Sequence, residues 1–347
     1  MKAVTLQDLA DTLGVARSTV SRALRDDPQI SPTTRHHVRR LARDLGYHPN
    51  AAARALTRRH SGVVGVALPR SAPFVFANPY FSTLLEGIAS IAEDAGVPIL
   101  FSASPTPDYE RWLREGRVDG LIALGYGVRT LDLEQLEGLA GRSAAIALVG
   151  APPRPTELPT VIADEAPGIA TACDRLAAAG HRELALVTGP EGAAYARARA
   201  SMWRTSATSA GMTIVATVHG DDTQPGGAAA ARHLLERDPV PDAWLFGNDA
   251  MAFGALGALE AAGVRVPSDV AVVGFDDVPP AALLGLTTVH QPVRALGEQA
   301  MRLVVAALRG DTAPGHTFST HLEERRTTRS APSTPAVSRH GVTEDVT

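Results

Sequence analysis

The chain has one cysteine, Cys173, among 347 residues, so it cannot form an internal disulfide. Cys173 lies in an apolar helical stretch, IATACDRLAAAG, and we expect it to be buried and unreactive. The sequence has no run of eighteen apolar residues and no basic-then-apolar signal at its N-terminus. We therefore expect a cytoplasmic protein without a membrane partner.

Motifs for catalysis and metal binding are also missing. No GxSxG nucleophile motif and no His/Cys cluster with metal-ligand spacing occurs, and His181, His290 and His316 are isolated in the sequence. GYGVRT at 125–130 approaches a dinucleotide fingerprint but has Thr where a third glycine is needed. We predict no metal and no cofactor, and we keep a nucleotide-dependent enzyme only as a minor alternative.

Charge is distributed unevenly along the chain. Residues 1–60 hold eleven Lys and Arg against five Asp and Glu, a net charge of +6. The whole chain carries −4, so the remaining 287 residues carry −10. A basic head on an acidic body is typical of a protein that meets nucleic-acid phosphates through one end.

The head has the pattern of a helix-turn-helix. Thr5 is a helix cap, apolar residues from Leu6 to Leu13 recur at helical spacing, Gly14 ends the helix, and a second helix begins near Arg17. We predict a third helix that starts at Ser31, buries Val38, Leu41, Ala42 and Leu45, and ends at Gly46. The second helix turns Val20 and Leu24 inward and leaves polar side chains outside, namely Arg17, Ser18, Ser21, Arg22 and Arg25.

Those exposed side-chain types bond base edges and phosphates, which predicts DNA binding. We expect Arg17 and Ser18 to reach base edges, and Arg22 to contact guanine or clamp a phosphate. Thr19 and Ser21 are placed to bond phosphates, with ordinary surface polarity as the alternative for the Ser and Thr residues. Thr5 and Leu6, at the start of the first helix, complete the predicted DNA-contacting set.

The rest of the chain alternates short apolar strands with amphipathic helices. Continuous Val, Ile and Leu runs separated by helices predict parallel sheets that are covered on both faces. Ligands bind beyond the carboxyl ends of such strands. Polar or aromatic residues that suit a small polyhydroxylated ligand follow several strands; they are Asn78, Tyr80, Phe81, Asp164, Arg197, Arg199, Asn248, Asp249, Asp276 and Asp277.

Several motifs resemble the lactose-repressor family of bacterial transcription regulators. TLQDLADTLGVARSTVSRAL at 5–24 is similar to TxxDVAxxAGVSxxTVSRxL, and YHPNAAARAL at 47–56 is similar to YxPNxxARxL. In the body, NDAMAFGAL, VAVVGFDD and LTTVHQP match family motifs, whereas DEAPG at 164–168 has Glu165 where DNxxG has Asn. RASMW at 199–203 is similar to RxxGF but has Met202 in place of glycine.

The resemblance implies an all-α helix-turn-helix head with a hinge helix, followed by a two-lobed α/β effector domain with parallel sheets, built like periplasmic binding proteins. The implied domains are residues 1–48 for the head, 49–61 for the hinge and 62–326 for the core. The N-terminal lobe covers about 62–163 and 291–318, and the C-terminal lobe covers about 164–290 plus a terminal strand. Residues 327–347 form a polar tail that we expect to be disordered.

The resemblance also implies site residues. Asn50, Ala53, Arg54 and Leu56 belong to a hinge that folds on DNA, with Leu56 as a wedge in the minor groove. For the ligand it carries over Tyr80, Phe81, Asp164, Arg199, Asn248 and Asp276. Residue reasoning leaves other roles open, because Asp164 also suits a helix cap, Asp249 and Asp277 suit caps or loop contacts, and Gln291 suits a crossover between lobes.

The predicted function is a homodimeric repressor that binds a pseudo-palindromic operator in double-stranded DNA. A small effector, a mono- or oligosaccharide by resemblance, controls it allosterically, and the tail lacks the leucine heptads that form tetramers. The resemblance places it with the bacterial nucleoid. The alternatives are a regulator without an effector, one that responds to purines or sugar phosphates, and a secreted solute-binding protein, against which the DNA head and missing signal argue.

Overall fold

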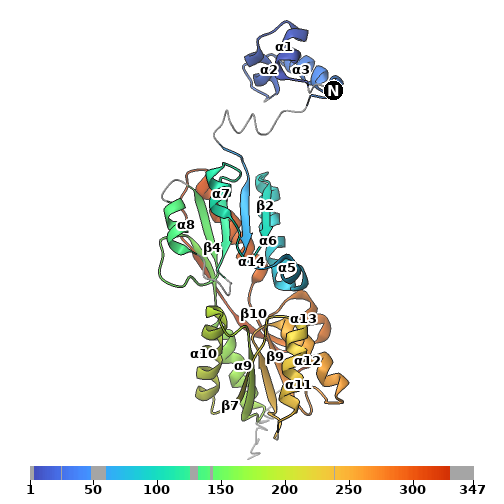
Figure 1. Ribbon diagram of the computed structural model, residues 1–347, viewed down its shortest axis with the longest axis vertical. Helices are drawn as coiled ribbons and strands as arrows, with labels where there is room; N and C mark the ends of the chain where they lie inside the picture. The colour runs from blue at the N-terminus through green and yellow to red at the C-terminus, as the bar shows by residue number, and fades with distance from the viewer. Residues whose placement is uncertain are drawn as a thin grey trace, which may run out of the picture. The chain divides into compact units, whose positions relative to one another are not determined.

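The computed structural model describes residues 4–24, 26–47, 60–125, 132–140, 144–237 and 239–328 (Figure 1). The chain divides into two compact units, Met1–Gly62 and Val63–Thr347, which we call the head and the body. Across these described ranges, no helix combines the length and apolarity needed to cross a membrane.

The head consists of three helices, α1 (Leu6–Leu13), α2 (Arg17–Leu24) and α3 (Pro32–Asp44). Thr5 and Asp8 cap α1 reciprocally, because the Thr5 hydroxyl accepts the Asp8 N–H while the Asp8 carboxylate accepts the Thr5 N–H. Gly14 ends α1 in the left-handed conformation, with φ of 63°, which glycine adopts without strain. These signals fix the helix–turn–helix geometry that the sequence predicts.

A small core holds the head together. Leu9, Ala10, Val20, Ala23, Val38 and Ala42 are its buried side chains. Leu41 and Leu24 pack against this core but are only partly buried. The prediction that α3 buries Leu45 is wrong, since Leu45 is 41% exposed. It follows the last helical residue, Asp44, where the apolar stripe of α3 has already passed the core.

The N-terminal lobe of the body is built on a six-stranded, entirely parallel sheet in the order β11-β5-β4-β3-β1-β2. Side chains from α6 and α14 pack on one face, and side chains from α7 and α8 cover the other. The strands are β1 (Val64–Leu68), β2 (Ile99–Ala103), β3 (Gly120–Leu124), β4 (Ala145–Val149), β5 (Thr160–Asp164) and β11 (His316–Ser319). The helices are α5 (Ala72–Ala77), α6 (Pro79–Ala95), α7 (Tyr109–Arg114), α8 (Leu133–Ala140) and α14 (Val293–Leu308).

The C-terminal lobe repeats this plan with the order β12-β10-β9-β8-β6-β7, in which only the β10–β12 pair is antiparallel. Alternate residues of β6 face α9 and α10 on one side and α11 and α12 on the other. The strands are β6 (Glu183–Thr188), β7 (Thr213–His219), β8 (Ala243–Phe246), β9 (Ala271–Asp276), β10 (Thr287–His290) and β12 (His321–Glu323). The helices are α9 (Ala166–Ala178), α10 (Ala194–Ser209), α11 (Gln224–Leu235), α12 (Asp249–Ala261) and α13 (Pro279–Leu284).

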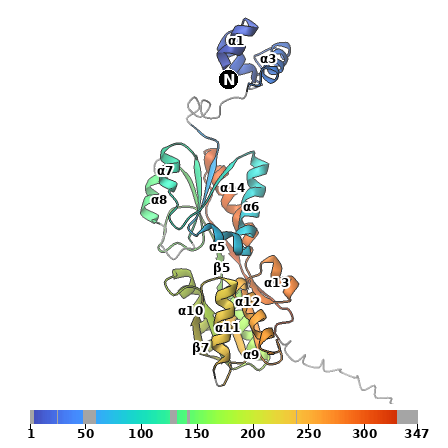
Figure 2. The ribbon, with the colours of Figure 1, turned by 45° about the vertical axis from the view of Figure 1, so that its right-hand side comes forward.

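The chain passes between the two lobes three times (Figure 2). The crossovers follow β5, β10 and β11. Beyond β12 the described chain continues to Thr328, and the buried Thr327 hydroxyl accepts the Thr287 N–H at 2.8 Å and donates to the Val272 carbonyl at 2.8 Å. Thr327, the first residue of the predicted tail, is therefore hydrogen-bonded to the body, and residues 329–347 lie outside the described residues.

Cys173 lies on α9 and is fully buried, as predicted. Burial raises the pKa of its thiol to about 12, so the reactive thiolate is scarce near neutral pH. This confirms the prediction of an unreactive cysteine.

Candidate functional site

Helix α2 exposes a polar surface on the head. Its Val20 and Ala23 face the core, while Arg17 and Ser18 are exposed. Thr19, Ser21 and Arg22 are partly exposed. The structure thus places these five predicted contacts on one short helix whose opposite side is buried.

Arg22 is held at the end of α2 by its own neighbours. Its Nε donates to Asp27 Oδ2 at 2.8 Å, and its Nη2 contacts Gln29. The hydrogen bond with Asp27 raises the pKa of Arg22, which keeps the guanidinium charged. Arg22 is therefore already bonded to Asp27, and a DNA group that binds Arg22 must share or displace that contact.

Two other predicted contacts in the head, Thr5 and Leu6, have structural roles here. The Thr5 hydroxyl caps α1, and Leu6 packs against the head core. Arg35 and Arg39 of α3 both pair with Asp26. The predicted hinge contacts Asn50, Ala53, Arg54 and Leu56 lie outside the described residues.

A cavity lies between the two lobes of the body. It has about 410 Å³ of empty space, including the part that opens to solvent. Both lobes contribute side chains to its walls. The lining residues are Arg70, Phe74, Asn78, Tyr80, Phe81, Tyr195, Arg199, Asp222, Asn248, Asp276 and Gln291.

Strand ends and helix starts position these side chains. Asp276 is the last residue of β9, Gln291 follows β10, and Asn248 follows β8 as the cap of α12. Asn78 caps α6 in the other lobe, where its side-chain oxygen accepts the Tyr80 N–H at 3.0 Å. The carboxyl ends of parallel strands meet at one edge of a sheet, and this brings the residues together.

Asp222 connects the two lobes. Its carboxylate accepts hydrogen bonds from Tyr195 Oη and, at 3.3 Å, from Arg70 Nη2. Its backbone carbonyl accepts the side-chain amides of Asn78 at 3.4 Å and Asn248 at 3.3 Å. Arg70 and Asn78 belong to the N-terminal lobe and the others to the C-terminal lobe, so one buried residue receives hydrogen bonds from both sides of the cavity.

Arg199 is fixed from several directions. Its Nε and Nη2 donate to the two oxygens of Glu165 at 2.8 and 2.6 Å, and its Nη1 donates to the Gly247 carbonyl at 2.7 Å. The guanidinium lies over the Phe275 ring, 3.7 Å from the centroid. Glu165, a departure from the similar family motif, thus supplies a forked partner to this arginine.

Asp276 is buried at the floor of the cavity. Gln291 Nε2 donates to its Oδ1 at 2.5 Å. Burial raises the pKa of Asp276 to about 7, although the Arg199 charge and the Gln291 hydrogen bond oppose this rise. Within the described chain, Gln291 Oε1 is buried without a hydrogen-bond partner, so it is ready to accept one from a ligand.

Five of the six predicted ligand contacts line the cavity, and Asp164 does not. Asp164 is exposed, and its carboxylate accepts the Ala166 N–H at 3.2 Å just before α9, whose cap position is Glu165. Four further residues that line the cavity, Arg70, Phe74, Tyr195 and Asp222, were not predicted from the sequence. A polar residue after a strand was the signal available for Arg70 and Asp222, whereas nothing local marks Tyr195 inside α10.

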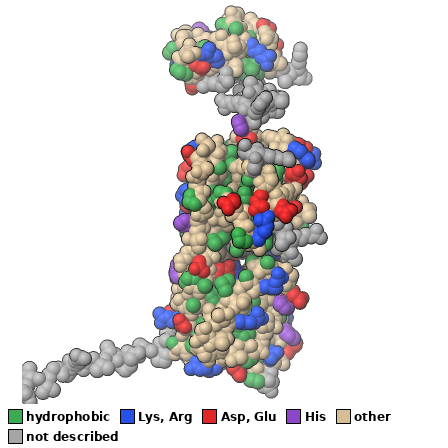
Figure 3. All heavy atoms as spheres, turned by 90° about the vertical axis from the view of Figure 1, so that its left-hand side faces the viewer, with side chains coloured by type: hydrophobic (Ala, Val, Ile, Leu, Met, Phe, Trp, Pro, Cys, Tyr) green, Lys and Arg blue, Asp and Glu red, His purple; other side chains and the backbone are tan. Residues whose placement is uncertain are grey.

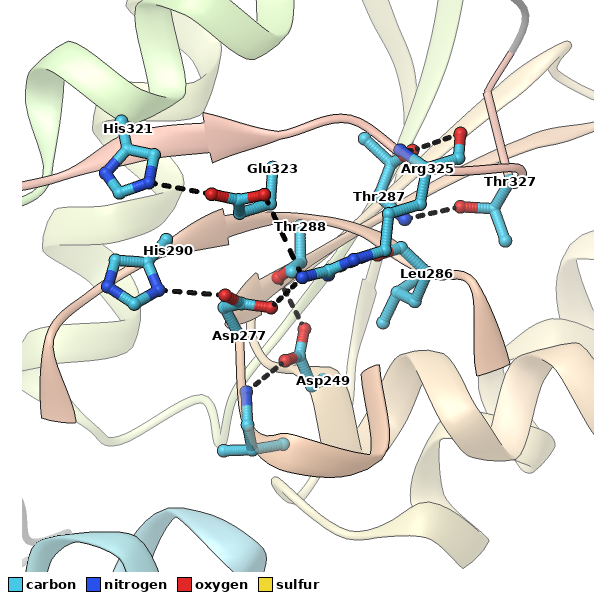
Figure 4. A network of polar contacts seen from close by, with 11 residues as sticks. Asp249, Asp277, Leu286, Thr287, Thr288, His290, His321, Glu323, Arg325 and Thr327 are labelled. Carbon is cyan, nitrogen blue, oxygen red and sulfur yellow. Dashed lines mark hydrogen bonds and ion pairs between the residues drawn. The ribbon is translucent and has the colours of Figure 1, made fainter. Parts of the chain in front are cut away.

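Asp249 and Asp277 hold the C-terminal lobe together, in agreement with the structural role that the sequence left open (Figure 4). The buried Asp249 accepts the Val278 N–H at 3.0 Å and the Thr288 hydroxyl at 2.6 Å. Asp277 pairs with His290 at 2.8 Å and with Arg325 at 2.7 Å. Burial opposes ionisation of Asp277, but these two partners lower its pKa overall.

On the face of the body that Figure 3 presents, acidic and basic side chains are interspersed. In the described ranges, His, Cys, Asp and Glu side chains form no group of three that could hold a metal ion. The lobe cavity and the α2 surface are therefore the two sites that the observations favour.

Comparison with known proteins identifies the family. A model described as "Bacterial regulatory proteins, lacI family" matches residues 5–50, and a "Periplasmic binding protein-like domain" matches residues 173–328. The HTH-type transcriptional regulator CelR of Thermobifida fusca is 34% identical over 318 residues, which are 89% of this chain and 93% of the relative. The chain belongs to the lacI family.

Other members of the lacI family extend the match. The lactose operon repressor of Escherichia coli (strain K12) is 30% identical over 354 residues, covering 97% of this chain and 94% of the relative. A lac repressor dimer solved with operator and the anti-inducer ONPF matches with a TM-score of 0.80 at 28% identity, covering 94% and 99% of the two chains. A CelR–cellobiose complex matches with a TM-score of 0.68 at 32% identity, covering 93% and 99%.

Membership of this family confirms the predicted fold class. It also confirms the prediction of a DNA-binding transcriptional regulator in preference to an enzyme, since the similar proteins are transcriptional regulators.

Proposed function

We propose that this chain is a dimeric repressor that binds a pseudo-palindromic operator. A saccharide bound between the lobes of the body controls its affinity for that operator. The cavity between the two lobes carries this proposal, because both lobes supply its polar walls and any ligand there contacts both. The proposal of a dimer is supported by the lac repressor, which was solved as a dimer on its operator.

The chemistry of the cavity suits a saccharide. Asn78, Asn248 and Gln291 present amides, which both donate and accept hydrogen bonds as sugar hydroxyls do. Phe74 and Phe81 pack edge to face, with ring centroids 5.8 Å apart, and offer apolar surface for the C–H face of a sugar ring. The CelR complex with cellobiose supports the same ligand class.

On the head, we propose that Arg17, Ser18 and Arg22 contact base edges, while Thr19 and Ser21 contact phosphates. The exposed side of α2 supports this assignment. Thr5 and Leu6 lie at the start of α1, and Asn50, Ala53, Arg54 and Leu56 complete the proposed contact set. Asp164, whose carboxylate accepts the Ala166 N–H just before α9, remains a proposed ligand contact through a turn of that loop toward the cavity.

Allosteric control follows from the connection of the lobes. A ligand that bridges neutral groups of both lobes, such as Asn78 and Gln291, changes the energy of one lobe arrangement relative to another. Coupling of about 1–3 kcal/mol between ligand and operator changes DNA affinity by roughly 5- to 150-fold, which is sufficient to switch a promoter.

Two measurements on the full chain test the proposal. Selection from a random duplex pool yields the preferred site, and we expect an inverted repeat. Thermal shifts are then recorded with cellobiose, lactose, glucose, ribose, adenine and guanine. A saccharide at 100 times its dissociation constant adds about 2.7 kcal/mol of stability.

A matched pair of variants ties the response to the cavity. Gln291→Met removes an amide from the cavity, and Gln135→Met removes one from α8, which does not line it. We expect only Gln291→Met to weaken saccharide binding. Stabilisation by adenine or guanine alone, or equal saccharide binding by both variants, contradicts the proposed effector site.

A further inference from the structure

Both arginines that line the cavity already have a carboxylate partner inside the protein. Arg70 Nη2 lies 3.3 Å from Asp222 Oδ2, with side chains that are 13% and 8% exposed. Arg199 makes a forked contact with Glu165, with side chains that are 7% and 14% exposed. These pairs are therefore largely shielded from water. Ion pairing is stronger in such shielded positions than at the surface.

The carboxylates of the cavity also have donors. Asp222 accepts a second hydrogen bond from the Tyr195 hydroxyl, and Asp276 accepts one from Gln291. Gly189 lets the Asp222 carboxylate lie close to the end of β6, because a side-chain carbon at position 189 would come within 2.6 Å of Asp222 Oδ1. Among the described residues that line the cavity, both arginines thus have an internal carboxylate partner, and both carboxylates accept an internal hydrogen bond.

We propose that Asp222 and Glu165 neutralise the two arginines and make the cavity select an uncharged, hydrogen-bonding ligand over its phosphorylated or carboxylated analogues. This inference rests on the proposed ligand site and names the charge class of ligand that the site accepts.

The physical reason is the fate of the displaced partner. An anion that takes the Nε–Nη2 fork of Arg199 must displace Glu165, which then stays buried and unpaired, a strongly unfavourable outcome. An anion that approaches Arg70 meets the buried Asp222 carboxylate, which lies 3.3 Å from Arg70 Nη2 and repels it. An uncharged hydroxyl instead satisfies neutral groups such as Gln291 Oε1 and leaves both ion pairs intact. The cavity therefore favours the binding of neutral hydroxyl groups and disfavours the binding of phosphate.

The residue at position 165 distinguishes this chain from the similar family motif. Glu165 stands where the similar family motif has Asn, and an amide could not neutralise Arg199. Its two oxygens occupy the Nε and Nη2 positions of the fork through which a guanidinium binds a phosphate in a bidentate manner. The Glu165 carboxylate thus occupies the two donors of Arg199 that would otherwise bind an anion.

The experiment measures binding of inorganic phosphate to the full chain by thermal shift at constant ionic strength, with chloride as the reference. We compare the unmodified chain with Asp222→Asn and Glu165→Gln, each of which keeps the shape of the side chain and removes its charge. We expect the phosphate Kd of both variants to be at least tenfold lower than that of the unmodified chain.

Two controls assign the effect to the cavity. Glu137→Gln removes the partner of Arg154 in a surface pair and is expected to leave phosphate binding unchanged. Arg70→Gln combined with Asp222→Asn is expected to abolish the gain. Phosphate bound by the head contributes equally to all these proteins, because none of the substitutions lies in it.

The unmodified chain supplies a second test that needs no variant to fold. We expect glucose 6-phosphate and glucuronate to bind at least tenfold more weakly than glucose. Tighter binding of either anion, or the absence of any gain in phosphate binding by two folded variants, overturns the inference. Failure of every neutral saccharide contradicts the proposed effector instead, while the phosphate comparison still decides the charge selection.

Discussion

Arg70 and Asp222 are 152 positions apart in the chain, yet their Nη2 and Oδ2 atoms lie 3.3 Å apart across the cavity. Arg70 follows β1 in the N-terminal lobe, and Asp222 follows β7 in the C-terminal lobe. Asp222 also has φ of 68°, a left-handed conformation that is uncommon outside glycine. A backbone held in this way at a lobe contact indicates that the surrounding hydrogen bonds determine its position.

Arg70→Met should destabilise the body, because Asp222 stays buried after its cation is removed. We expect the free energy of unfolding to fall by about 3 kcal/mol, measured by urea denaturation. Arg154→Met, which breaks an exposed pair with Glu137, is the control and should have no measurable effect. Equal stability of the two variants would show that the lobe contact contributes nothing.

Asp276 should make stability depend on pH. Its carboxyl has a pKa of about 7 in the folded chain and an ordinary value of 3.8. The folded state binds the extra proton between these values, so this residue makes the free energy of unfolding decrease as pH rises from about 4 to about 7. Asp276→Asn should remove that decrease, measured by denaturation at pH 5, 6, 7 and 8.

The control for this prediction is Asp311→Asn, which changes an exposed carboxylate after α14. It should keep the pH dependence of the unmodified chain. If Asp276→Asn and the unmodified chain have parallel pH profiles, Asp276 does not hold an extra proton in the folded state.

Arg22→Ala should weaken operator binding, since its guanidinium is presented at the end of the exposed α2 surface. We expect a loss of specific affinity of about tenfold or more, with little change on random duplexes, if Arg22 contacts a base. Fluorescence anisotropy with the selected inverted repeat measures both. A similar loss on both duplexes would assign Arg22 to phosphate, and Arg302→Ala on α14 of the body provides the unaffected control.

Asp27→Asn tests the intramolecular partner of Arg22. Asp27 competes with DNA for the guanidinium through a 2.8 Å hydrogen bond. Removing its charge should increase nonspecific affinity and the salt dependence of binding, measured by anisotropy at several salt concentrations. A decrease of specific affinity would instead show that Asp27 positions Arg22 for the operator.

Leu56→Ala tests the hinge, which the sequence alone predicts. An apolar wedge unstacks a base step and kinks the duplex, so its removal should reduce the operator bend. Electrophoretic phasing of permuted operator fragments measures the bend, and Leu283→Ala, on an exposed part of α13, is the control. Identical phasing of the Leu56 variant and the unmodified chain would remove Leu56 from the wedge role.

Local patterns predicted most of the fold because each depends on neighbouring residues. The Thr5 cap and the Gly14 terminator each act within one turn of helix, and both are present as expected; Asp8 completes the cap. The predicted burial of Leu45 was wrong because it depends on where α3 ends relative to the head core. Helical periodicity alone does not specify that position.

The amino-acid sequence by itself determined the helices of the head, the alternating strands and helices of the body, and the positions where polar residues follow strands. Only the tertiary structure decided which of those polar residues meet. It brings Arg70 to Asp222 and Glu165 to Arg199, and it leaves Asp164 at a helix start outside the cavity. Secondary structure is encoded by short-range geometry, whereas ion pairs between distant segments depend on how two lobes pack, which no local spacing specifies.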